Sequence, residues 1–144
     1  MCAGDIEMAE SVFDELKKIE KKIDETGYTV DQISYYIGCD LVTMTLSDLK
    51  PLKDALLRNK IIGAKDNLTL TRIDDAVTDI RAICQEWHFD DDIASRLTNI
   101  VELSDGYYKM WADGSCASYG NLTSVCRVLQ KGEEFVLLEF YICD

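Results

Sequence analysis

Apolar residues recur every three or four positions over most of the first two thirds of the chain. This period places them on one face of an α-helix. Five helices are expected from it: residues 5–26, residues 29–38, a helix capped by Ser47 or Asp48 and ending before Gly63, residues 68–87, and a helix capped by residues 90–92 and ending near Gly106. Residues 41–46 are rich in β-branched side chains but short, so strand and loop both stay open.

The pattern changes after residue 106. Strands are expected over residues 107–111, 125–130 and 135–143, with a loop over residues 115–121 and a turn at Lys131-Gly132. Residues 135–143 are apolar on both faces apart from Glu139, which is typical of a central strand. The fold class expected is therefore α+β: about five helices followed by a small, mostly antiparallel C-terminal sheet. We expect a single domain over residues 1–144, helical over 1–105 and β-rich over 106–144.

Length and composition are those of a packed domain. The chain has 144 residues, of which 47% are hydrophobic, and it has no basic and apolar leader or membrane-length apolar run. We therefore expect a cytoplasmic protein, in which the Asn-x-Thr sequons at Asn67 and Asn121 stay unmodified. The six cysteines lack zinc-ligand spacing and are expected as reduced thiols, a disulfide between two of them being the alternative: Cys2, Cys39, Cys84, Cys116, Cys126 and Cys143.

The net charge is −12, from 27 acidic against 15 basic residues. Such a surplus repels nucleic acid phosphates and anionic lipid, and it favours a basic protein surface as partner. Two acidic clusters and two tyrosine doublets are the candidate partner-binding residues: Asp74, Asp75, Asp79, Asp90, Asp91, Asp92, Tyr35, Tyr36, Tyr107 and Tyr108. The alternative is that the aspartates are helix caps and solvated faces, and that the tyrosines pack at the rim of the core.

Familiar catalytic and cofactor-binding patterns are missing from the sequence. The one histidine, His88, lies between aromatic residues in no recognisable nucleophile setting, and we expect it to pack at a helix end. Consecutive aspartates at 90–92 point about 100° apart on a helix, so they do not converge on a metal ion. We predict no catalytic residues, no metal and no cofactor.

Residues 29–47 weakly resemble a helix-turn-helix, with Ile33, Ser34 and Ile37 before Gly38 at the turn position. The segment that would follow the turn, residues 40–48, carries two aspartates and no Lys or Arg. Because DNA affinity comes from basic side chains on phosphates, direct nucleic acid binding is not expected.

The leading hypothesis is a non-enzymatic, acidic interaction protein whose carboxylates face a basic partner. One concrete version is an inhibitor, like small acidic proteins of phages and mobile elements, that mimics nucleic acid in the groove of a basic enzyme. The first alternative is a small enzyme or ligand-binding domain with a pocket between helices and sheet. The second is a structural or assembly subunit, in which residues 135–143 or the first helix form a homo-oligomer interface.

Overall fold

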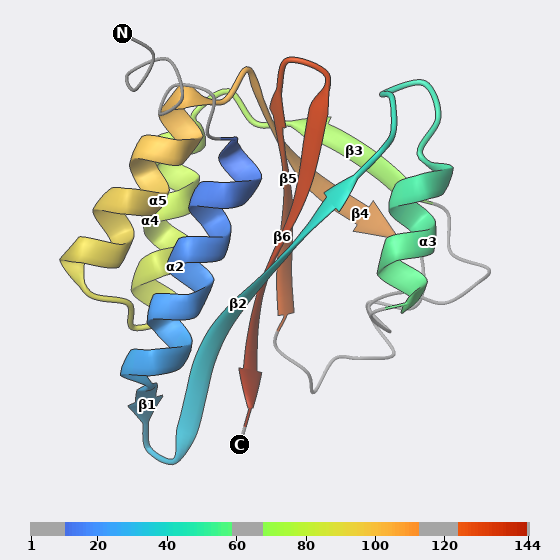
Figure 1. Cartoon of the computed structure of the whole chain (residues 1–144). Coiled ribbons are helices and arrows are strands. Elements are labelled where there is room, and N and C mark those ends of the chain that lie inside the picture. Colours follow the sequence, from blue (N-terminus) through green and yellow to red (C-terminus); the bar gives the residue numbers. More distant parts are fainter. Residues whose placement is uncertain (1–10, 59–67, 113–123, 144) are drawn as a thin grey trace, which may run out of the picture.

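The computed structural model describes residues 11–58, 68–112 and 124–143, which form four helices and six strands (Figure 1). In chain order the elements are α2 (Val12–Thr26), β1 (Tyr28–Val30), β2 (Ile33–Val42), α3 (Lys50–Arg58), β3 (Leu68–Arg72), α4 (Ala76–Glu86), α5 (Asp91–Leu103), β4 (Gly106–Ala112), β5 (Ser124–Lys131) and β6 (Glu134–Cys143). The α+β class is confirmed, with four described helices in place of about five.

The strands form one antiparallel sheet in the order β1-β2-β6-β5-β4-β3. The central position of β6 between β2 and β5 is confirmed, and so is the hairpin turn at Lys131-Gly132, where Gly132 has a φ of 60°. The sheet is larger than expected and is not confined to the C-terminal part, because β1, β2 and β3 come from the first half of the chain.

Each face of the sheet carries its own core. Helices α2, α4 and α5 cover one face, and α3 covers the other (Figure 1). Alternation along β6 serves both cores, since Val136 and Leu138 join the first while Phe135 and Leu137 join the second. This explains why the strand is apolar at almost every position.

The expected end of the first helix at Gly27 is confirmed, but the helix begins at Val12 and does not run through residue 11 as expected, because Ser11 is extended and caps it. Ser11 and Asp14 form a capping box at the start of α2, which ends at Gly27 in the left-handed conformation. The carboxylate of Asp48 accepts from the amide of Lys50 at 3.1 Å, and Pro51 lies in the first turn of α3. The expected helical residues 5–10, the end of α3 before Gly63, and the loop at 115–121 lie outside the described residues.

The helix expected over residues 29–38 is wrong. Asp31 and Gln32 have φ values of 51° and 71°, and they form a tight hairpin turn between β1 and β2. Ile33 and Ile37 are four apart, which suits a helix, but the structure uses the period of two, so Ile37 and Cys39 enter the same core. The resemblance to a helix-turn-helix is therefore not a structural one. Strand β2 continues through residues 41 and 42, the first two of the segment 41–46 for which strand and loop were both possible.

The first part of the helix expected over residues 68–87 is also wrong. Leu68–Arg72 is strand β3, because Leu-Thr-Leu-Thr alternates with period two and pairs with β4. Helix α4 begins only at Ala76, where the carboxylate of Asp75 caps the first turn by accepting from the amide of Thr78 at 3.3 Å.

Four cysteines lie in the described part of the chain, and no disulfide joins any two of these four. Cys39 and Cys84 are buried in the first core, Cys126 is half-buried, and Cys143 is exposed. Cys2, Cys116 and the sequons at Asn67 and Asn121 lie outside the described residues. None of the helices that the structure describes is both long and apolar enough to cross a membrane.

Candidate functional site

The two acidic clusters lie at opposite ends of the α4–α5 pair (Figure 1). Asp74 and Asp75 precede α4, and Asp79 lies in its first turn. Residues 90–92 begin α5, which runs back along α4. The six aspartates therefore do not form one continuous face, and each cluster has surroundings of its own.

Asp79 faces inward. Its carboxylate accepts from Nε and Nη2 of Arg127 at 2.8 and 3.1 Å and from the hydroxyl of Tyr107 at 2.6 Å. Burial by itself would raise the pKa of the carboxyl, but the hydrogen bonds from Arg127 and Tyr107 outweigh it and lower that pKa. Asp79 thus fastens α4 to the sheet, and its charge is neutralised within the fold.

The cluster at residues 90–92 is also partly engaged. Asp90 caps α5, accepting from the amide of Ile93 at 3.0 Å and from the hydroxyl of Tyr28 at 2.7 Å. These two contacts, the amide first, lower the pKa of its carboxyl. Asp92 forms an ion pair with Lys22 on α2 at 2.6 Å. Of this cluster, Asp90 and Asp92 connect α5 to neighbouring elements, as expected of helix caps, and Asp91 faces solvent.

The tyrosine doublets are mostly part of the cores. Tyr107 and Tyr108 are 3% and 6% exposed and point to opposite faces of the sheet, each into a different core. This confirms that adjacent strand residues cannot share a layer, and it removes both rings from the surface. Tyr36 stacks on Tyr141 with ring centroids 5.6 Å apart and is half-buried.

Tyr35 belongs to β2, and its ring packs on Trp87 and His88 at the end of α4. Their ring centroids lie 6.3 and 5.0 Å from that of Tyr35. His88 itself has a φ of 61°, so it ends the helix in the left-handed conformation while its ring packs on an aromatic neighbour, which confirms the expected packing role.

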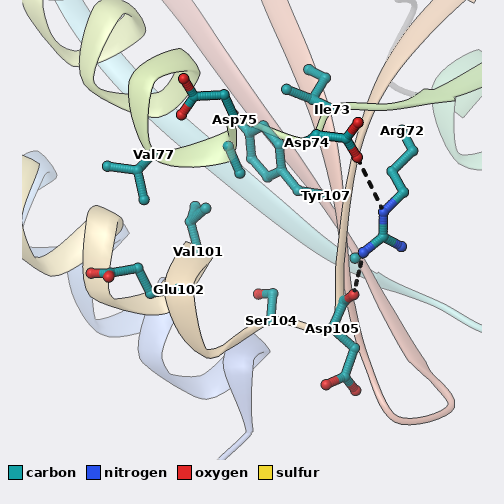
Figure 2. Close-up of a pocket in the computed structure, with 12 residues that line it drawn as sticks. Arg72, Ile73, Asp74, Asp75, Val77, Val101, Glu102, Ser104, Asp105 and Tyr107 are labelled. Carbon is teal, nitrogen blue, oxygen red and sulfur yellow. Dashed lines mark hydrogen bonds and ion pairs between the residues drawn. The ribbon is translucent and has the colours of Figure 1, made fainter.

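A hollow of about 270 Å³ lies where the end of β3, the start of α4, the end of α5 and the start of β4 meet. We call it the acidic hollow; residues 72–77, 101–102 and 104–107 line it. Figure 2 shows Val77 and Val101 between Asp75 and Glu102, with Asp105 lower down beyond Ser104. The hollow therefore places two valine side chains among acidic residues.

Four acidic residues and one basic residue, Arg72, line the acidic hollow. Arg72 donates from Nη2 to the carbonyl of Asp105 at 3.0 Å, and its Nε lies 3.9 Å from the carboxylate of Asp74 (Figure 2). The amide of Gly132 donates to Asp105 at 2.6 Å, and this contact, with Lys131 nearby, lowers the pKa of that carboxyl. The start of α4 carries a positive partial charge and the end of α5 a negative one, so the two helix ends largely cancel. The charged side chains therefore determine the sign of the electrostatic potential in the hollow.

Two other hollows of the described residues have balanced charges. One, of about 600 Å³, lies between α4 and α5 and is lined by Arg81 and Asp91 among uncharged residues. The other, of about 330 Å³, lies beside α3 and is lined by two acidic and two basic residues. The acidic hollow differs from both by its surplus of carboxylates.

Sequence reasoning found Asp74 and Asp75 of this site but missed Arg72, Glu102 and Asp105. Glu102 is one of several exposed acids on α5, and Asp105 follows the helix end, so only the folded chain brings them close to Asp75. Within the described ranges no three His, Cys, Asp or Glu side chains are grouped as a metal site. Comparison with models of protein families finds no match, and comparison with curated proteins finds no significantly similar sequence.

Proposed function

We propose that the protein is a non-enzymatic interaction protein that receives basic side chains of a larger partner in the acidic hollow. The observation that carries this proposal is the lining of the hollow, in which four acidic residues and one basic residue lie around the side chains of Val77 and Val101. Lys and Arg have the matching shape, since their long stems lie on apolar surface while the charged head stays at a wet rim. The inhibitor that mimics nucleic acid is one version of this function.

The pKa shifts agree with an anionic binding surface better than with acid–base catalysis. The pKa of the carboxyl is lowered at Asp79, Asp90 and Asp105, and of these three residues Asp105 lines the hollow. A general acid at neutral pH needs a raised carboxyl pKa. The lowered pKa keeps the carboxyl of Asp105 charged, which suits contact with a cationic partner, whereas Asp79 and Asp90 are paired within the fold.

Affinity at such a site requires several contacts together. One exposed ion pair contributes only about 0.2–1 kcal/mol, so a single lysine would bind weakly. A partner that places two or three basic side chains at the rim gains more, and its attraction falls as salt shortens the Debye length from about 10 Å at 0.1 M to about 3 Å at 1 M.

The test compares two double variants with the same change of net charge. Asp74→Asn with Glu102→Gln removes two carboxylates of the hollow, and Glu25→Gln with Glu86→Gln removes two exposed ones at the far ends of α2 and α4. Binding of a Lys-rich synthetic peptide is measured by titration calorimetry. We expect the first variant to lose about two- to thirtyfold in affinity at 0.1 M salt, from two exposed ion pairs at about 0.2–1 kcal/mol each, and the second to lose little.

Equal losses in the two variants would mean that the peptide responds to net charge alone and that the hollow is not the site. An affinity unchanged between about 0.1 and 1 M salt would contradict the electrostatic basis of the proposal.

A further inference from the structure

The two edges of the sheet are treated differently. At one edge β1 covers only the first residues of β2. Farther along β2, helix α2 covers the edge: the carboxylate of Glu20 on α2 accepts from the backbone amide of Cys39 at 3.3 Å. A side chain that occupies edge amides in this way hinders the addition of a foreign strand.

The other edge is β3, which ends the strand order and is paired on one side only among the described residues. The amide of Ile73 donates to the carbonyl of Tyr107 at 2.9 Å, in register with the β3–β4 ladder. Because bonding groups alternate along an antiparallel pair, Thr71 then points its backbone groups toward β4, whereas Leu70 and Arg72 point theirs outward. None of the described strands pairs with these outward groups, so within the described part of the chain the edge offers donors and acceptors to a further strand.

The open edge leads directly into the acidic hollow. Arg72 ends β3 and is also the first residue that lines the hollow, followed by Asp74 and Asp75. A strand added antiparallel to β3, as all pairs in this sheet are, would have its N-terminal end beside the hollow. Basic side chains at that end would meet the carboxylates of the rim.

We propose that β3 is a docking edge for an extended, basic segment of the partner, which adds to the sheet as a strand and places a Lys or Arg in the acidic hollow. The proposal rests on the proposed function, since charge complementarity selects the occupant. A second copy of the chain fits less well, because the base its β3 would offer, Arg72, already contacts Asp105 and Asp74. Leu68 and Leu70, both half-buried, would extend the apolar contact on one face of the added strand.

The experiment uses the full chain, labelled with ¹⁵N, and two eight-residue peptides of alternating lysine and valine. The second peptide is N-methylated at every residue, which removes the amide donors from both of its edges and keeps its charge. We expect the unmodified peptide to bind at least about tenfold more tightly, since several backbone hydrogen bonds are lost on methylation. We also expect it alone to slow hydrogen exchange at the amides of Leu70 and Arg72.

Each other outcome separates this inference from the proposed function. If both peptides bound equally and Asp74→Asn with Glu102→Gln weakened both, the hollow would remain the binding site and the docking edge would be overturned. Protection at Leu41 on β2 in place of Leu70 would overturn the choice of edge. Protection of Leu70 in a dimer without peptide, seen by light scattering, would make a second copy the occupant. Binding of neither peptide, or binding that ignores the hollow variant, would overturn both proposals.

Discussion

Replacing Arg127 by methionine removes the cation that holds Asp79 against the sheet. The pair is well shielded, with side chains 14% and 24% exposed and two hydrogen bonds of 2.8 and 3.1 Å. Hydrogen bonds to charged groups contribute about 1.5–3 kcal/mol, and breaking a fully buried pair costs about 3–5 kcal/mol. Since this pair is partly exposed and Tyr107 still donates to Asp79, we expect Arg127→Met to lower the free energy of unfolding by about 2 kcal/mol.

The assay is urea unfolding of Arg127→Met, Asp79→Asn and the double variant. If the two groups stabilise the fold through each other, the double variant is less destabilised than the sum of the singles, by about 1 kcal/mol or more. Arg96→Met is the matched control: its guanidinium lies 4.0 Å from Asp92 in an exposed pair, and we expect a loss below about 0.5 kcal/mol.

The same pair predicts how stability depends on pH. The pKa of Asp79 is lowered in the folded state, so the native protein holds this carboxyl charged where the unfolded chain would protonate it. Its contribution is full above the ordinary carboxyl value of 3.8 and is lost as pH falls through the lower, folded pKa. The stability difference between the native chain and Arg127→Met should therefore be constant near neutral pH and shrink below about pH 4.

Additive single variants, or an Arg127→Met loss no larger than that of Arg96→Met, would refute this reasoning. The stabilising effect of Asp79 would then not depend on Arg127, and its carboxylate would be available to a partner.

Two further predictions concern the cores. Leu138 is 0% exposed, so Leu138→Ala should cost about 2–5 kcal/mol in chemical unfolding, whereas Leu103→Ala, at a residue 67% exposed, should change stability by less than about 0.5 kcal/mol; equal effects would contradict the described packing. Burial raises the pKa of the thiols of Cys39 and Cys84 to about 12. Iodoacetamide at pH 8 should therefore modify the exposed Cys143 before Cys39 and Cys84, which it should reach only on unfolding, as peptide mass mapping would show. Early labelling of Cys84 would place it outside the core.

The elements that the sequence predicted well are those with one clear period and a clear boundary. Helix α5 has a regular apolar stripe and an aspartate cap, and β6 is apolar at nearly every position. Residues 29–38 misled because Ile33 with Ile37 satisfies both helical and alternating spacing. Residues 68–72 misled because Leu70 with Ile73 satisfies helical spacing, whereas the alternation of Leu68 with Leu70 is the one that the structure uses. In such short runs, pairing with another strand determines whether the segment becomes a helix or a strand, and that pairing depends on residues far along the chain.

Only part of the candidate site could be predicted from the sequence, for a related reason. Surplus charge indicated an acidic surface, and Asp74 and Asp75 are part of the hollow. The partner of Asp79 was hidden, because Arg127 lies 48 positions away and no local pattern marks it. Likewise, Glu102 approaches Asp75 only because α5 runs back along α4.

The strand shared by the two cores also determines when they can form. Ile37 on β2 pairs with Phe140 on β6, which is about a hundred residues later. During synthesis β2 must therefore wait for a neighbour that emerges after every other described element, and until then both layers of helices lack their common support. Contacts between such distant segments slow folding. We expect the nascent chain to remain without a closed interior until β6 has left the ribosome.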